Sequence, residues 1–235
     1  INGDIEQVAQ EEYPLIFPND GWVEIDPDTL YKSVSNTLEQ LNLKDIKFGG
    51  ITNQRETTII WDKNTLEPIY NAIVWQDRRT SEYCSELATD HNKSIVKEKT
   101  GLLIDSYFSA TKIKWILDNV EGARAKAEAG ELCFGTVDTY LMYRLSAGKV
   151  FKTDITNASR TMLFNINTLT WDDTLLKLFD IPETLLPEVV HSDSCFGSLS
   201  ELGDITIHAV LGDQQAALFG QGCLEKGQLK STYGT

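Results

Sequence analysis

Short apolar stretches rich in β-branched residues alternate along this chain with stretches of helical periodicity, a pattern typical of α/β and α+β proteins. The clearest helix follows Asp26, whose side chain can cap it, and Pro27 suits its first turn. Apolar side chains then recur on one face until Asn42. Strands are predicted over 46–52, 56–62, 72–75 and 205–211, and further helices within 80–130, over 136–145, after Asp172 and over 216–220.

Acidic residues outnumber basic ones by 35 to 21, which gives a net charge of -14. Because no cluster of Lys or Arg interrupts this excess, the sequence argues against a nucleic-acid partner. No apolar run approaches the roughly 18 residues that a membrane span requires, and the first residues do not resemble a secretory signal. We therefore expect no membrane partner.

The four cysteines are scattered, and no two of them stand at the spacing of a metal or redox motif. Free thiols in a reducing, cytoplasmic compartment are the expected state. The three histidines share no metal-ligand spacing either, so the sequence predicts no protein-bound metal.

The common nucleotide and nucleophile signatures are absent: the chain has no G-x-x-x-x-G-K-[ST], G-x-G-x-x-G or G-x-S-x-G motif. Their absence excludes several familiar machineries without excluding the use of a nucleotide. Three places remain where chemistry could occur.

The first place is Arg55-Glu56, at a junction between two predicted strands. In a turn, both side chains can converge on a small polyol, with Arg donating hydrogen bonds to the hydroxyl groups and Glu accepting them. The alternative is a surface charge pair, and the dipeptide alone favours that alternative.

The second place is aromatic: Trp75 precedes Gln76 at the end of an apolar strand, and Tyr107 precedes Phe108. An aromatic wall can pack against the C–H groups of a polyol. Core packing is the commoner role of such residues, and alone it is the better explanation here.

The third place is Asp213-Gln214, between a predicted strand and a helix. Open α/β sheets bind ligands at the carboxyl ends of their strands. There Asp213 can accept a proton from a substrate hydroxyl, as phosphoryl transfer requires. Capping of the following helix is an equally good explanation from spacing alone.

The longer segments that contain these residues carry a more specific signal than the single residues do. The chain closely resembles the FGGY family of carbohydrate kinases, and within it the glycerol kinases. The resemblance runs essentially end to end and is carried by GWVE (21–24), ITNQRETT (51–58), YNAIVWQ (70–76), GTVDT (135–139), TNASRTMLFN (156–165) and GDQQAALFGQ (212–221).

The resemblance implies an α/β fold, the actin-like, ribonuclease-H-like domain of a sugar kinase. It implies ATP-dependent phosphorylation of glycerol, with Mg²⁺, by a protein that assembles as a homo-oligomer, a dimer or a tetramer. The roles that it implies are general base for Asp213, hydroxyl binding for Arg55 and Glu56, packing on the carbon chain for Trp75, completion of the pocket for Tyr107 and Gln214, and contact with the ATP phosphates for Thr235.

The chain departs from the family at its two ends. Glycerol kinases open with a strand and an Asp-Gln-Gly-Thr-Thr-Ser loop, and they continue past the point that corresponds to Thr235. We therefore expect residues 1–235 to form part of an N-terminal, substrate-binding domain, without the first strands and without the C-terminal domain. On its own, such a chain should have no kinase activity.

A second departure lies at residues 198–204, where many bacterial relatives carry a basic, glycine-rich loop that binds fructose 1,6-bisphosphate. This chain has two acids and no Lys or Arg there, so the sequence predicts no inhibition by that effector. The alternatives to a glycerol kinase are an FGGY kinase for another polyol or sugar, and a non-catalytic protein on the same fold.

Overall fold

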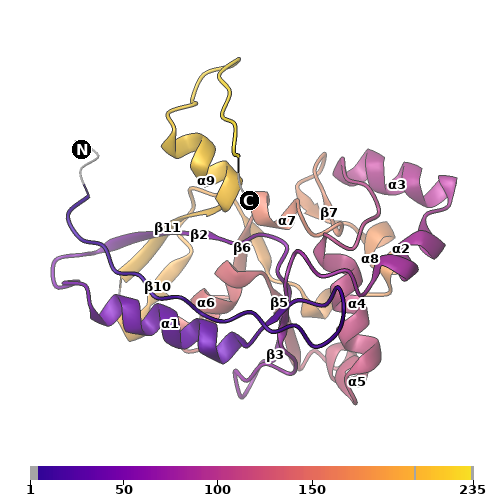
Figure 1. Cartoon of the computed structure of the whole chain (residues 1–235), viewed down its shortest axis with the longest axis horizontal. Coiled ribbons are helices and arrows are strands. Elements are labelled where there is room, and N and C mark those ends of the chain that lie inside the picture. The colour runs from indigo at the N-terminus through magenta and orange to yellow at the C-terminus, as the bar shows by residue number, and fades with distance from the viewer. Residues whose placement is uncertain (1–4, 204, 234–235) are drawn as a thin grey trace.

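The structure, a computed structural model, describes residues 5–203 and 205–233. Its largest sheet has the order β10-β11-β2, in which β10 (Gly197–Leu199) is antiparallel to β11 (Ile205–Gly212) and β11 is parallel to β2 (Phe48–Asn53). Gly212 pairs with Asn53, the last residue of β2. The carboxyl ends of the two parallel strands therefore lie side by side, and the segments that follow them leave the sheet at the same edge (Figure 1).

Short strand pairs surround this sheet and join it to the helices. The remaining strands are β1 (Glu24–Ile25), β3 (Ile59–Asp62), β4 (Ala72–Ile73), β5 (Leu132–Gly135), β6 (Lys152–Asp154), β7 (Phe164–Asn165), β8 (Thr170–Trp171) and β9 (Glu188–Val190). The helices are α1 (Pro27–Glu39), α2 (Ser81–Leu87), α3 (Asp90–Thr100), α4 (Ser109–Asn119), α5 (Ala123–Glu128), α6 (Val137–Leu145), α7 (Ile155–Ala158), α8 (Asp173–Phe179) and α9 (Asp213–Gly220), with 3₁₀ turns η1 (Glu183–Leu185) and η2 (Ser200–Leu202).

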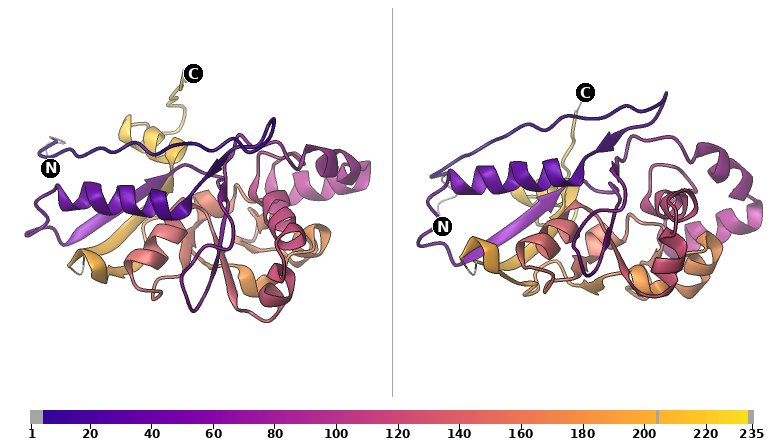
Figure 2. Two further views of the ribbon diagram at one scale, coloured as in Figure 1. Left: turned by 60° about the horizontal axis from the view of Figure 1, so that its bottom comes forward. Right: turned by 90° about the horizontal axis from the view of Figure 1, so that it is seen from below.

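The core has two parts. One lies between the sheet and the helices α1 and α6, around Trp61 and Tyr140, and Figure 2 shows α1 running alongside β2. The other lies among α4, α5 and α8, around Ile113 and Phe134. Figure 1 shows α2, α3, α4, α5 and α8 gathered on the side of the molecule opposite the large sheet.

The predicted first helix is confirmed, since it begins at Pro27 with Asp26 as its side-chain cap, but it ends at Glu39 rather than at Asn42. The strand predicted over 56–62 begins only at Ile59. Residues before it form a tight turn, in which Thr57 N donates to Arg55 O at 2.8 Å and Glu56 has φ 62°. The turn delays the start of the strand because a residue with positive φ does not fit a regular β-ladder.

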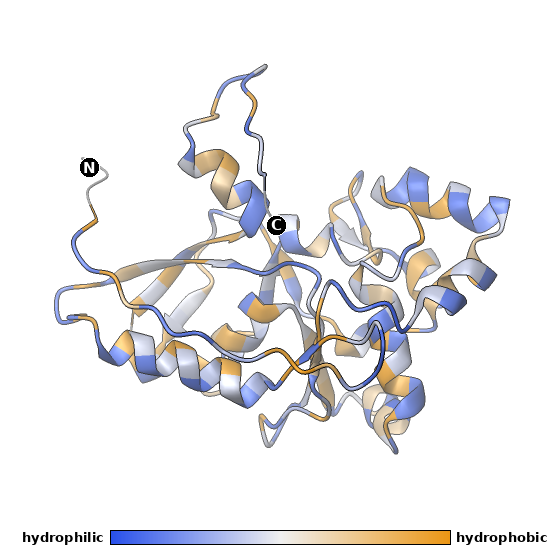
Figure 3. Cartoon of the chain, viewed as in Figure 1, coloured by the Kyte–Doolittle hydropathy of each residue, from blue (hydrophilic) through white to orange (hydrophobic). Residues whose placement is uncertain are grey.

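Some apolar side chains of the large sheet and of α9 are exposed to solvent. Phe48 of β2 is 68% exposed and Phe219 of α9 is 65% exposed. Figure 3 shows the polar first turn of α9 in blue and its apolar second turn in orange. No helix among residues 5–203 and 205–233 is long and apolar enough to cross a membrane.

Gly135, at the end of β5, offers a test of core packing. A Cβ atom there would lie 2.6 Å from Thr139 Cβ and 3.0 Å from the Trp61 ring. We expect Gly135→Ala to lower the free energy of unfolding by about 1–3 kcal/mol, the usual cost of overpacking. Urea unfolding would measure it, with Gly220→Ala as the control, because no atom lies within 4 Å of a Cβ at that position. Equal stability of the two variants would contradict the packing.

Candidate active site

The turn that follows β2 presents Arg55 and Glu56. The hydrogen bond from Thr57 N to Arg55 O spans two residues, and Glu56 between them has φ 62°, so the segment is a γ-turn of the strained, left-handed kind. Two hydroxyl groups hold its central carbonyl: Thr58 Oγ1 donates to Glu56 O at 3.2 Å and Ser109 Oγ at 3.3 Å. The strain is thus maintained by contacts from Thr58, directly before β3, and from the first residue of α4.

Asp213 follows β11 directly and meets Arg55. Arg55 Nε lies 2.7 Å from Asp213 Oδ1, and Arg55 Nη1 donates to Gln215 Oε1 at 3.3 Å. This contact arises because β2 and β11 are parallel neighbours and end together. The capping alternative for Asp213 is wrong: Gly212 occupies the cap position, and Asp213 is the first residue of α9.

The Asp213 carboxylate is held by one oxygen. Oδ1 accepts from Gln214 N at 2.7 Å and lies 2.7 Å from Arg55 Nε, whereas Oδ2 accepts no hydrogen bond from the described residues. The side chain is 43% exposed. It can therefore accept a proton from a ligand through Oδ2 while Arg55 fixes its orientation.

Glu56 is buried, at 2% exposure, and pairs with Arg160, whose Nε donates to Glu56 Oε1 at 2.6 Å. Burial raises the pKa of this carboxyl, and the charges of Arg160, Arg55 and Lys112 oppose that rise. Arg160 follows α7, 104 residues away along the chain, so only the fold brings the two together. Sequence reasoning did not select Arg160, although the residue lies within the 156–165 segment that carries the family resemblance.

The aromatic residues form a wall beside these charges. The rings of Trp75 and Tyr107 are 5.5 Å apart between centroids, and the Arg160 guanidinium lies 5.8 Å from the Tyr107 ring centre. Burial raises the pKa of the Tyr107 hydroxyl, and the nearby charges of Glu56 and Asp213 raise it further. Tyr107 therefore lies within the electrostatic reach of both carboxylates.

Lys112 fastens the segment that carries Tyr107. Its side chain is completely buried, and Nζ donates to Tyr107 O at 2.5 Å and to Phe108 O at 3.4 Å. Burial lowers the pKa of this ammonium to about 7, partly offset by the Glu56 charge. A single Lys within a helical pattern gives no sequence signal for such a role.

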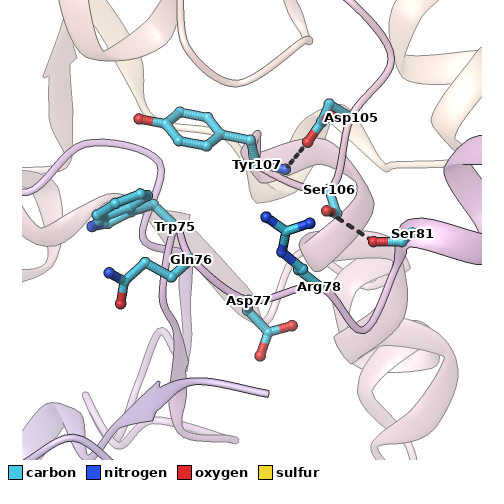
Figure 4. A pocket seen from close by; sticks show the side chains of 8 residues that line it. All are labelled: Trp75, Gln76, Asp77, Arg78, Ser81, Asp105, Ser106 and Tyr107. Carbon is cyan, nitrogen blue, oxygen red and sulfur yellow. Dashed lines mark hydrogen bonds between the residues drawn. The ribbon is translucent and has the colours of Figure 1, made fainter. Parts of the chain in front are cut away.

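A pocket of about 450 Å³ opens next to the aromatic wall. Figure 4 shows the Trp75 and Tyr107 rings on one side of it and Arg78 and Ser81 on the other. The pocket shares the two aromatic residues with the candidate site, but Arg55, Glu56 and Asp213 do not line it.

The side-chain amide of Gln214 contacts residues outside the candidate site. Its Oε1 accepts from Lys230 Nζ at 2.8 Å and from Thr232 Oγ1 at 3.1 Å, so its amide contacts the chain beyond α9. Thr235, expected near the ATP phosphates, lies outside the described residues. The roles of both stay predictions.

Behind the turn, a buried carboxylate joins β2 to α6. Asn53 Nδ2 donates to Asp138 Oδ1 at 2.7 Å, and the hydroxyl of Thr136 donates to the same oxygen. Asp138 is fully buried, and burial raises its pKa to about 6. A carboxyl with a raised pKa stabilises the fold fully below its unfolded pKa, and that contribution is lost as pH rises through about 6.

Asp138→Asn should remove this pH dependence. We expect the wild-type protein to lose about 2 kcal/mol of unfolding free energy relative to the variant between pH 4 and pH 7, from a shift of roughly two pKa units. Urea unfolding at several pH values measures the difference, and Asp193→Asn, at an exposed position, serves as the control. A difference that stays constant with pH would contradict the buried-charge account.

Fold and site together define an α/β protein in which polar side chains gather at the carboxyl ends of two parallel strands, next to an aromatic wall. Residues 1–220 match the sequence model of the FGGY family of carbohydrate kinases, N-terminal domain. The chain belongs to this family. The expected actin-like, ribonuclease-H-like α/β fold is thereby confirmed.

Individual relatives are also similar. The chain is 56% identical to a glycerol kinase of Alteromonas mediterranea over 98% of this chain and 49% of that protein, and 54% identical to one of Francisella philomiragia over 99% and 49%. A crystal structure of Plasmodium falciparum glycerol kinase with ADP has a TM-score of 0.88 and 38% identity, over 92% of this chain and 46% of that one. The chain spans about half the length of the curated relatives it matches.

Proposed function

We propose that this chain is the substrate-binding half of an enzyme that transfers the γ-phosphoryl group of ATP to glycerol and forms sn-glycerol 3-phosphate. The observation that supports the proposal is the meeting of Arg55 with Asp213 at the carboxyl ends of β2 and β11, next to the buried Glu56. Within the matched region, two relatives named as glycerol kinases are 56% and 54% identical to this chain.

Each proposed role follows from chemistry that the side chain has available. Arg55 donates to one glycerol hydroxyl, and the Glu56 carboxylate accepts from another. The Trp75 ring packs against the carbon chain, while Tyr107 and Gln214 complete the pocket. Because Glu56 stays paired with Arg160, its carboxylate is already oriented before glycerol arrives.

In the proposed reaction, Asp213 Oδ2 removes the proton from a terminal hydroxyl of glycerol. The glycerol oxygen then forms a bond to the γ-phosphorus of ATP. The bond between the γ-phosphorus and the oxygen that bridges to the β-phosphate breaks, and ADP leaves. Phosphoryl transfer depends mainly on positioning and charge stabilisation, so one oriented carboxylate is the main chemical demand on this half of the protein.

Mg²⁺ enters this proposal as part of the nucleotide substrate. Among residues 5–203 and 205–233, no three His, Cys, Asp or Glu side chains gather into a metal site. No step above depends on a metal ion bound by the protein.

The expected domain organisation remains part of the proposal. Residues 1–235 would be the partial N-terminal domain, and a C-terminal half, which the relatives' greater length suggests, would supply more of the nucleotide site. We propose that the complete protein is a homo-oligomer, and that residues 1–235 alone do not turn over ATP.

The test is glycerol-dependent release of ADP by the complete protein that contains this chain. We expect turnover with glycerol at least tenfold above that with xylulose or gluconate. A preference for another polyol or sugar would replace glycerol as the substrate but keep the kinase. Binding of glycerol without turnover would favour the non-catalytic alternative.

The same assay tests the predicted insensitivity to fructose 1,6-bisphosphate. Within the described part of 198–204, Glu201 accepts from the Tyr31 hydroxyl, and neither Lys nor Arg is present. Since the local charge repels a bisphosphate, we expect unchanged turnover at millimolar effector. Inhibition that disappears when this loop is mutated would overturn the prediction.

A further inference from the structure

The segment from β6 to Arg160 touches both arms of the candidate site. Near its start, Thr156 Oγ1 accepts from Gly212 N at 2.8 Å, directly before Asp213. Just beyond the other end of α7, Arg160 binds Glu56. One helical turn thus connects the proposed base to the proposed hydroxyl acceptor.

The direction of the hydrogen bonds at Thr156 is fixed. Its single hydroxyl proton goes to Asp154 Oδ2, 2.6 Å away, so a lone pair is left for the Gly212 N–H. Asp154 is fully buried. Its carboxylate accepts four further hydrogen bonds, from Thr156 N, Asn157 N, Asn157 Nδ2 and Ser192 Oγ. Because each of these partners donates to the carboxylate, the set of hydrogen bonds holds Asp154 in place and so anchors the Thr156 hydroxyl.

The position of Gly212 also decides where Arg55 lies. A Cβ atom at Gly212 would come within 2.5 Å of Arg55 Cδ and 2.8 Å of Gln215 Oε1. The peptide of Gly212 is therefore in close contact with the same side chain that orients Asp213. A small shift at this peptide would move the carboxylate and its orienting arginine together.

We propose that Thr156, anchored by Asp154, is a positioning residue for Asp213. Thr156 fixes the end of β11 through the Gly212 N–H, and it therefore affects the chemical step. The Glu56–Arg160 contact orients the carboxylate that is proposed to bind glycerol. This inference rests on the proposed function for its kinetic part. Its structural part, the hydrogen bond to Gly212, does not.

The kinetic test uses the complete protein. Thr156→Val keeps the shape of the side chain and removes the hydroxyl, and we expect kcat to fall about 10- to 100-fold, as a small misplacement of a catalytic group does. The KM for glycerol should change less than threefold. Thr156→Ser should restore most of the turnover. Ser159→Ala is the control, because it removes a hydroxyl that donates to the backbone carbonyl of Thr156 and not to Gly212.

A double variant separates positioning from general damage. If Thr156 acts through Asp213, then Thr156→Val should not reduce turnover further in a protein that already carries Asp213→Asn. An additive loss, a failure of Thr156→Ser to restore kcat, or an equal change in kcat and KM would overturn the proposal. Should Thr156→Val not fold, Thr156→Ala provides the same comparison with a smaller side chain.

Amide hydrogen exchange tests the structural part without any activity. Exchange over 211–215 should accelerate in Thr156→Val and stay unchanged in Thr156→Ser. Unchanged exchange in Thr156→Val would overturn the hydrogen bond to Gly212. If the wild-type protein shows no glycerol-dependent turnover but the exchange result holds, the proposed function fails and the structural inference stands.

Discussion

Asp213→Asn in the complete protein should abolish most of the turnover while glycerol still binds. Asn keeps an oxygen that can face Arg55 Nε, which lies 2.7 Å from the carboxylate, so the pocket should hold its shape. The amide cannot take up the hydroxyl proton. Since general-base catalysis is typically worth 10²- to 10⁴-fold, we expect kcat to fall by about that factor and the Kd for glycerol to change little.

ADP release and isothermal titration with glycerol measure the two quantities separately. Asp193→Asn makes the same chemical change at an exposed position and should leave both quantities unchanged. Full turnover in Asp213→Asn would end the assignment of this residue as the base. Loss of glycerol binding would instead mean that the carboxylate is mainly a substrate ligand.

Glu56→Gln should act mainly on binding. The carboxylate is 2% exposed, and its pKa is raised because burial outweighs the charge of Arg160. A hydrogen bond to a charged group is worth about 1.5–3 kcal/mol, so replacing the carboxylate by an amide should raise the KM for glycerol roughly 10- to 100-fold. Folding should be largely spared, because the Gln amide oxygen can still accept from Arg160 Nε and the Arg160 side chain is 24% exposed.

Initial rates over a range of glycerol concentrations give the KM, and thermal unfolding checks that the variant is folded. Glu82→Gln, at an exposed position of α2, is the matched control. An unchanged KM would remove Glu56 from the list of glycerol ligands. A large fall in melting temperature would show that the ion pair with Arg160 serves the fold before it serves the site.

Local signals predicted the elements that local chemistry determines. Asp26 caps α1 and Asp172 caps α8, as the sequence indicates. The start of β3 was misplaced because the γ-turn at Glu56 depends on hydroxyl groups outside the turn, including that of Ser109. A turn that is held by tertiary contacts leaves no periodicity to read.

In the site, too, the sequence predicted what depends on local chemistry and missed what depends on tertiary contacts. Arg55 and Asp213 were each ambiguous on their own, and they become one unit only because β2 and β11 end together. Arg160 and Lys112 were missed, since an ion pair across 104 residues and a Lys bonded to two carbonyls have no sequence spacing. The family resemblance supplied the residue roles, and those roles await the experiments above.

The left-handed backbone at Glu56 has a consequence for any engineering of this protein. The φ of 62° at Glu56 is unfavourable for most residues that carry a Cβ atom, whereas glycine adopts it without steric cost. A screen that selects for thermal stability alone should therefore favour Gly or Asn at this position. Such variants would discard the carboxylate on which glycerol recognition is proposed to depend. Variant libraries designed for thermal stability should keep Glu56 unchanged, because stability and activity favour different amino acids at this position.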